Sequence, residues 1–325
     1  MTFDKTVFIP VDPDEAFALI TQPERLRRWK TIAARVDLRV GGEYRWTMVP
    51  GHSAVGTFTE IEPGKHVVFT WGWEGSTDLA PGASTVSVTL DAADGGTTVR
   101  LVHEGLTAEQ EVAHAEGWNH FLHRLITFAS TGDAGADEWA AAPDPINELI
   151  SAEASLAVLQ RVLANLTPAH RDVQTPCEGF TVHQLVEHLF GSIASIGGAL
   201  GVDVVDQPAA APEVRIADAA QITLEAFRAR GLDGTVDMGF AELPATIVAN
   251  ILNLEFLVHA WDLAVASGQD LIVSPVLSEY VLKLARNTIS PEMRGGSFAE
   301  EVLVAESAGS VQRLVAFTGR RVASV

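Results

Sequence analysis

The sequence predicts an α+β protein made of two domains with different secondary structure. Up to residue 103, apolar and polar residues alternate in short segments separated by Gly, Pro and Asp, which is typical of an antiparallel sheet with tight turns. Beyond residue 145 the apolar residues recur at helical spacing. Between these parts, residues 130–145 (STGDAGADEWAAAPDP) have no apolar period, as expected of a linker. We therefore expect one domain over residues 1–135 and a second over residues 136–325.

The composition is that of a globular protein with a strong negative charge. Hydrophobic residues make up 47% of the chain, and the formal net charge is −20 at pH 7. An acidic chain is repelled by nucleic acid and by anionic membrane surfaces, so we expect neither as a partner. The single cysteine, Cys177, excludes an internal disulfide and a cysteine-based zinc site. No signal peptide and no long uncharged apolar run is visible, which predicts a cytoplasmic protein.

The first domain begins with a strand, followed by a short helix that Asp12 and Pro13 introduce and by a second short helix over residues 23–30. A long helix is predicted over residues 107–129, with Trp118, Phe121 and Leu125 on its apolar side. Further strands are predicted over residues 35–40, 42–49, 55–60, 67–73, 84–90 and 97–103. A curved antiparallel sheet that is followed by a long helix is the helix-grip arrangement.

Four segments carry a resemblance to a known family: RVGGEYRWTM, GTFTEIEPGKHVVFTWGW, STVSVTLDAADGGTTVRLVHEGL and GWNHFLHRL. They resemble the AHSA1-like branch of the START/Bet v 1 (SRPBCC) superfamily, over nearly all of residues 1–130. The resemblance implies a cavity between sheet and long helix that holds a small hydrophobic ligand. It does not imply Hsp90 activation, because most bacterial members lack the partner domain which that activity needs. The candidate ligand-binding residues are Trp46, Trp71, Trp73, His103, Trp118 and Phe121. Core packing is the alternative for each of them, and a structural histidine is the alternative for His103.

The second half predicts a four-helix bundle with additions. Helices are predicted over residues 144–166, 181–200, 216–230, 244–267, 274–289 and 311–318. Thr181 is placed to cap the second of these helices, and Pro168 ends the first.

One predicted helix carries an unusual polar stripe. Within NLEFLVHAWDLA, the residues Glu255, His259 and Asp262 follow the spacing i, i+4, i+7 and so lie on one face of an otherwise apolar helix. Three ionisable groups on a buried stripe are costly unless a partner compensates them, and a divalent metal does so well. A helix at the surface and an ion pair within the core are the alternatives. His188 on a neighbouring helix is the natural third ligand, whereas His183 lies five residues earlier and is rotated away.

A second resemblance bears on this stripe. TPCEGFTVHQLVEHLFG, NLEFLVHAWDLAVASG and RLVAFTGR resemble the actinobacterial DinB-like metal-binding proteins, a superfamily that includes the mycothiol-dependent maleylpyruvate isomerases. The resemblance implies a metal held by His188, Glu255 and His259. The metal would be zinc, with nickel, iron or manganese as alternatives, and mycothiol would be a co-substrate. Phe180 replaces the usual Trp. Cys177 is interpreted as a packing residue rather than a nucleophile.

These observations lead to one favoured function and two alternatives. The favoured hypothesis is a metal- and thiol-dependent transferase or isomerase. In it, Glu255 completes the charge balance at the metal, and Asp262 orients a histidine ligand or shuttles a proton. The partners would be a small hydrophobic ligand or an electrophilic substrate, and bundles of this kind often form homodimers. The alternatives are a non-catalytic ligand-binding or stress-response protein with a structural metal, and a metallohydrolase that uses bound water.

Overall fold

The computed structural model describes residues 1–295, 298–305 and 307–322. Contacts divide the chain into two compact units, Met1–Asp137 and Glu138–Val325, and each is described by itself. Unit 1 combines an antiparallel sheet with helices, whereas unit 2 is largely helical. The predicted α+β fold class is confirmed.

Unit 1 is organised by a seven-stranded sheet in the order β1-β7-β6-β5-β4-β3-β2. All neighbouring strands pair in antiparallel fashion. The register shifts between Thr47 and Val49 and between Phe58 and Glu60, and such bulges bend a sheet. The strands are β1 (Phe3–Ile9), β2 (Ala33–Val36), β3 (Glu43–Val49), β4 (His52–Glu62), β5 (His66–Trp73), β6 (Ser84–Ala93) and β7 (Gly96–Glu104).

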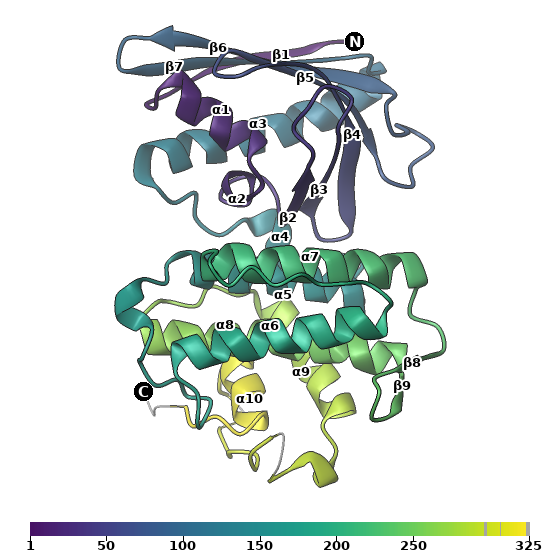
Figure 1. Ribbon diagram of the computed structural model, residues 1–325, viewed down its shortest axis with the longest axis vertical. Helices are drawn as coiled ribbons and strands as arrows, with labels where there is room; N and C mark the ends of the chain where they lie inside the picture. Colours follow the sequence, from purple (N-terminus) through teal and green to yellow (C-terminus); the bar gives the residue numbers. More distant parts are fainter. Residues whose placement is uncertain (296–297, 306, 323–325) are drawn as a thin grey trace. The chain divides into compact units, whose positions relative to one another are not determined.

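Three helices lie on one side of this sheet (Figure 1). They are α1 (Pro13–Thr21), α2 (Pro23–Leu26) and the long α3 (Ala108–Thr131). Thr107 starts α3 with a capping box, in which its hydroxyl accepts from the Gln110 backbone while the Gln110 side chain accepts from the Thr107 backbone. Trp118, Phe121 and Leu125 of α3 are buried in the same core as the inward-facing strand residues. This is the helix-grip arrangement that the sequence predicts.

Two elements of unit 1 are shorter than their sequence patterns suggest. The strand expected over residues 35–40 ends at Val36, because residues 37–42 form a hydrogen-bonded turn in which Arg39 donates to Asp37 and Gly42 donates to Arg39. The helix expected over residues 23–30 ends at Leu26, and irregular turns follow. Apolar spacing alone does not distinguish such turns from a continued helix.

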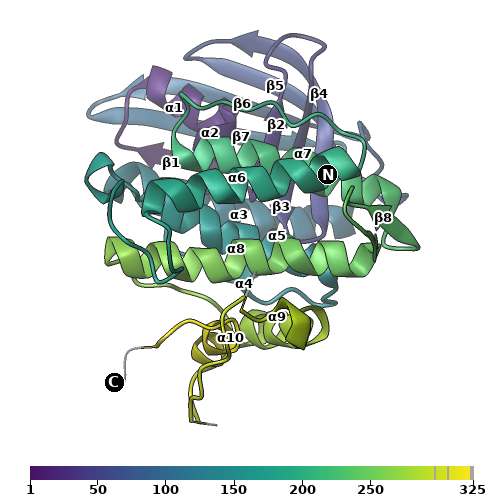
Figure 2. The same cartoon turned by 60° about the horizontal axis from the view of Figure 1, so that its bottom comes forward.

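Unit 2 is a bundle of four long helices, α5 (Glu148–Ala164), α6 (Val182–Ala199), α7 (Pro212–Arg230) and α8 (Ala245–Ser267). Helices α5 and α6 each contact both α7 and α8, and Figure 2 shows this arrangement. The additional helices are α4 (Glu138–Ala141), α9 (Pro275–Thr288) and α10 (Ser310–Phe317), with 3-10 turns at Pro168–His170 and Pro291–Met293. Helix α9 packs against α5, α8 and α10.

Three features of unit 2 differ from the sequence-based prediction. Helix α5 begins at Glu148 rather than near residue 144, because the Asn147 side chain caps it by accepting from Leu149 and Ile150. Helix α7 begins at Pro212, since proline suits the first turn of a helix. A hairpin of β8 (Thr235–Asp237) and β9 (Glu242–Pro244) precedes α8, and strands this short leave no clear alternation in a sequence.

Helix α8 is the most apolar helix of the bundle. By length and composition it could span a membrane, and its most apolar window has a mean hydropathy of 1.3. However, 78% of that window is buried inside the structure, as in the core helix of a globular protein. Its neighbours in the bundle therefore explain its apolar surface.

Helix α6 has a capping box that can be tested directly. The Thr181 hydroxyl accepts from the Gln184 backbone, and the Gln184 side chain accepts from the Thr181 backbone. We expect Thr181→Ala to lower the stability of α6 by about 1 kcal/mol, because one backbone donor loses its partner. Hydrogen-exchange mass spectrometry on α6 peptides measures this change. Thr181→Ser, which keeps the hydroxyl, should exchange like the wild type. Equal exchange in Thr181→Ala and wild type would contradict the role of the cap.

Candidate functional site

The polar stripe of α8 lies inside the bundle. His259 and Asp262 are buried, and the side chain of Glu255 is only 15% exposed. Because the three residues are one helical turn apart, the helix presents them on one face. Ionisable groups in such a position require compensating partners.

Helix α6 supplies a second histidine to the same place. His188 Nε2 lies 3.3 Å from Glu255 Oε2, and His259 Nε2 lies 3.6 Å from the same oxygen. The two imidazole rings meet edge to face, with centroids 5.3 Å apart. One ligand atom from each of the three residues falls within 4.8 Å of the others. The residues predicted as metal ligands are therefore close together in space, as a common metal ion would require.

The shared oxygen of this cluster is incompletely satisfied. Glu255 Oε2 is buried and accepts no hydrogen bond of normal geometry from the described part of the chain. A buried carboxylate oxygen without a donor is unusual and requires an explanation. Two imidazoles and one carboxylate form a donor set that suits zinc and related divalent ions. The cluster thus fits a divalent cation chemically, in addition to placing its atoms at a suitable separation.

Asp262 holds His259 in a defined orientation. The His259 Nδ1–H group donates to Asp262 Oδ2 over 2.9 Å, and the other ring nitrogen, Nε2, faces Glu255 Oε2 at 3.6 Å. This arrangement of a carboxylate behind a histidine is common at metal sites. Asp262 is fully buried, so its position favours an orienting role over a proton shuttle to solvent.

Arg320 balances the charge of Asp262. Arg320 Nη2 donates to Asp262 Oδ2 over 2.9 Å, and Arg320 Nε donates to Asp262 Oδ1 over 3.3 Å. Arg320 is itself buried. No local sequence pattern predicts this role, because Arg320 lies 58 residues from Asp262. Its only sequence signal is its place in the segment RLVAFTGR, which belongs to the second resemblance.

The charges of the cluster shift its protonation equilibria. Interaction with Glu255 raises the pKa of His188, although partial burial acts in the opposite direction. Burial alone would raise the pKa of Glu255, but the His188 and His259 imidazoles outweigh it and hold that pKa below its usual value. Burial likewise opposes ionisation of Asp262, but His259 and Arg320 lower its pKa overall. Both carboxylates are therefore ionised at neutral pH, as metal ligation and orientation require.

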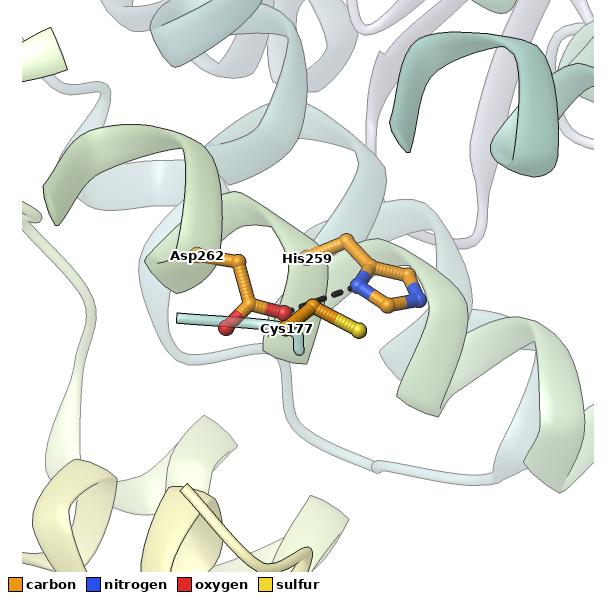
Figure 3. Close-up of side chains that lie close together, drawn as sticks. All are labelled: Cys177, His259 and Asp262. Atoms are coloured by element: carbon orange, nitrogen blue, oxygen red, sulfur yellow. Dashed lines mark hydrogen bonds and ion pairs between the residues drawn. The ribbon is translucent and has the colours of Figure 1, made fainter. Parts of the chain in front are cut away.

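Cys177 lies next to the buried end of this cluster. Its sulfur is within 4.8 Å of a ligand atom of His259 and of Asp262, and Figure 3 shows the three side chains together. Burial raises the pKa of the Cys177 thiol, and Asp262 and Glu255 add to this effect while Arg320 opposes it. A thiol in such surroundings is a weak nucleophile.

Phe180 and His183 lie at the start of α6, and only Phe180 contacts His188. The Phe180 ring packs against His188 with centroids 5.3 Å apart. His183 Nδ1 lies 3.8 Å from Glu187, so His183 faces another part of the helix and is not in the ligand cluster. As predicted from the sequence, His183 points away from the face of α6 that carries His188.

Five of the six candidate ligand-binding residues of unit 1 form one aromatic cluster, and the sixth, Phe121, lies in the same hydrophobic core. Trp46, Trp71, His103, Trp118 and Phe121 are buried, and Trp73 is half-buried. The Trp71 ring contacts the rings of Trp46, Trp73, His103 and Trp118. The cluster lies where α3 packs on the sheet, so these residues contribute to the core whether or not they also bind a ligand.

His103 has a complete set of hydrogen-bond partners. Trp118 Nε1–H donates to His103 Nδ1 over 3.0 Å, and His103 Nε2 lies 2.9 Å from the Ser84 hydroxyl. Because Ser84 donates its own proton to the Trp71 carbonyl, His103 Nε2 is the donor in that pair. Burial, with the charges of His114 and Lys30, lowers the pKa of His103 to about 3. His103 is thus neutral and structural in its contacts.

The two units define a class of protein: a helix-grip domain joined to a helical bundle that carries a two-histidine, one-carboxylate cluster. Comparison with known protein families gives the same division into two domains. The model of "Activator of Hsp90 ATPase homolog 1-like protein" matches residues 10–129, and that of "Mycothiol maleylpyruvate isomerase N-terminal domain" matches residues 152–264. The predicted fusion of an AHSA1-like domain with a DinB-like domain is confirmed.

A curated relative matches more than half of the chain. The chain is 31% identical over 185 residues to "Uncharacterized protein Rv0738" of Mycobacterium tuberculosis, a match that spans 55% of this chain and 99% of the relative. The chain therefore belongs to the family of that mycobacterial protein.

Solved structures resemble part of the chain. DynU16, from the dynemicin biosynthetic locus, is 20% identical with a TM-score of 0.39, and the match covers 45% of this chain and 56% of DynU16. CalU16 from Micromonospora echinospora is 27% identical with a TM-score of 0.34, and the match covers 40% of this chain and 77% of CalU16.

The buried Arg320–Asp262 pair can be tested with a double-mutant cycle. We expect Arg320→Met to destabilise unit 2 by about 3 kcal/mol, because it leaves the Asp262 carboxylate buried without its guanidinium. Combining Arg320→Met with Asp262→Asn should recover part of the loss, since no buried charge then remains unpaired. Hydrogen exchange of α8 peptides reads out unit 2 separately from unit 1. Strictly additive effects of the two substitutions would show that the residues do not interact.

Proposed function

We propose that the protein is a divalent-metal- and thiol-dependent transferase or isomerase, with its reaction centre at His188, Glu255 and His259. The observation that carries this proposal is the buried Glu255 Oε2, which lies between two imidazole nitrogens and accepts no hydrogen bond from the described residues. A cation supplies the missing partner. The match to the mycothiol maleylpyruvate isomerase N-terminal family supports the thiol part.

Each residue has a distinct part in this proposal. His188 and His259 would hold the metal through Nε2, and Glu255 would hold it through Oε2. Asp262 keeps the proton of His259 on Nδ1 by accepting its hydrogen bond, and Arg320 keeps Asp262 ionised. The two side chains act through His259 and need no contact with a substrate.

Metal at this site would supply the acidity that makes a bound thiol available as a thiolate at neutral pH. Zinc is the ion that we favour, since three protein ligands of this kind leave one coordination position for the thiol. The thiol would be mycothiol or a similar low-molecular-weight thiol, and the second substrate would be an electrophile. A metallohydrolase would use the same ligands with water, so dependence on thiol separates the two.

Unit 1 would hold a small hydrophobic ligand. Its AHSA1-like match and its cluster of buried aromatic rings support this part of the proposal. The ligand could be the electrophilic substrate itself or a compound that is sensed, and the non-catalytic alternative keeps only this binding role together with a structural metal.

Metal content distinguishes the ligands from nearby histidines. We expect purified wild-type protein to contain about one divalent metal ion per chain, measured by elemental analysis after incubation with zinc and desalting. His188→Ala and His259→Ala should each lose most of it, because a three-ligand site does not survive the loss of one ligand. His183→Ala is the matched control on α6 and should retain the metal. Wild-type protein that takes up no zinc would rule out the proposed centre.

A cysteine variant distinguishes metal-bound thiol chemistry from cysteine chemistry. We expect Cys177→Ser to keep both its metal and its rate of thiol consumption within about twofold of wild type, since the buried thiol of Cys177 is a poor nucleophile. The assay follows loss of a low-molecular-weight thiol in the presence of chlorodinitrobenzene, with His259→Ala as the inactive control. A variant that retains metal but consumes no thiol would instead assign the chemistry to Cys177.

A further inference from the structure

Unit 1 buries a lysine among tryptophan rings. Lys30 follows α2 and is only 5% exposed. Its Nζ lies 3.9 Å from the centroid of the Trp46 ring, 4.9 Å from that of Trp118 and 5.6 Å from that of Trp71. The Trp29 ring is 5.9 Å away. The chain has few lysines, and this one is placed in the apolar core.

Lys30 has no counter-ion among the described residues. In that part of the chain its ammonium forms no ion pair with a carboxylate and donates no hydrogen bond. Contact with aromatic faces stabilises an ammonium by less than the usual cost of burying an unpaired charge. Burial accordingly lowers the pKa of Lys30 to about 7. A buried charge without a partner is a common mark of a functional site.

Two further donors in the same cluster also lack partners. Trp46 Nε1 and Trp71 Nε1 are buried and have no hydrogen-bond acceptor among the described residues. Buried indole N–H groups usually find an acceptor. Their rings are 6.3 Å apart and both contact Lys30. Three donors without acceptors in the described part of the chain therefore lie close together, and one of them, the Lys30 amine, becomes positively charged when it is protonated.

Two histidines, His103 and His114, lie beside these donors and differ in their hydrogen bonds. His103 has both ring nitrogens bonded and cannot serve these donors. His114 Nδ1 lies 2.7 Å from the Gln110 carbonyl, to which it donates, so its buried Nε2 is left as an acceptor without a partner. Nε2 could accept a hydroxyl proton from a ligand. The cluster thus has unused hydrogen-bonding capacity that core packing alone does not explain.

We infer that the aromatic cluster around Lys30 binds a small apolar molecule that carries a carboxylate. The carboxylate would become the counter-ion of Lys30 and accept from the indole N–H groups of Trp46 and Trp71, and the apolar part would lie against the tryptophan faces. This inference rests on the ligand-binding role proposed for unit 1 and specifies the class of ligand. An uncharged hydrophobic ligand would leave all three donors unsatisfied.

The test compares an acid with its amide. We would titrate the full-length protein with 1-naphthylacetate and with 1-naphthylacetamide, which have the same ring system but differ in charge, and measure binding by isothermal titration calorimetry. The acid should bind wild-type protein at least about tenfold more tightly than the amide, the effect of one charge-assisted hydrogen bond. Lys30→Met should remove this preference while it retains binding of the amide.

Two variants act as controls. Lys65→Met removes an exposed lysine that pairs with Glu62 and should bind both probes like the wild type. Trp46→Phe keeps an aromatic ring but removes one N–H donor, so it should weaken the acid severalfold and leave the amide unchanged.

The possible results separate this inference from the general ligand-binding role. Equal affinity for acid and amide in the wild type would overturn the carboxylate site and leave the ligand-binding role of unit 1 intact. An acid preference that survives in Lys30→Met would also overturn it, because the charge would then be recognised elsewhere. Binding of neither probe would count against both the carboxylate site and the ligand-binding role.

Discussion

The structure of unit 2 depends on a carboxylate placed where water cannot reach it. Asp262 is fully buried, and it is stabilised on one side by Arg320 and on the other by His259. Each of these bonds determines a further feature. The arginine connects the end of the chain to α8, and the histidine is held with Nε2 directed toward Glu255. Because a buried carboxylate without partners is so unfavourable, the fold of the C-terminal segment and the geometry of the candidate centre are linked through one side chain.

Much of this arrangement could be predicted from local pattern. The i, i+4, i+7 spacing on α8 placed Glu255, His259 and Asp262 on one face, and the capping signal at Thr181 fixed the start of the helix that carries His188. Residues on one face of a helix are close together in the chain, so their spacing can be read directly from the sequence. Arg320 could not be found in this way, because its partner is 58 residues away and only tertiary packing brings the two together.

In the interior of unit 1, one functional candidate could not be predicted from local sequence patterns. Its strands and its long helix follow from alternation and capping, whereas the position of Lys30 does not. Residues 27–30 (RRWK) follow α2 and are basic except for Trp29, and a lysine in such a segment would normally extend to solvent. The turn that ends α2 at Leu26 directs it into the aromatic cluster instead. The sequence therefore predicted the aromatic residues of the cluster but not Lys30, which lies among them.

Each unit buries polar groups that lack a hydrogen-bond partner among the described residues, and the missing partners have opposite charge in the two units. In unit 2, Glu255 Oε2 lies beside two imidazoles and accepts no hydrogen bond from the described residues, so a cation would complete it. In unit 1, the indole N–H groups of Trp46 and Trp71 have no acceptor among the described residues, and Lys30 lies on their ring faces without a carboxylate partner there, so an anion would complete this cluster. Hydrophobic packing alone explains neither cluster, because apolar side chains of similar size would fill the same space without unsatisfied groups. We therefore propose that each unit functions at its own unsatisfied cluster, where a ligand would complete the polar groups.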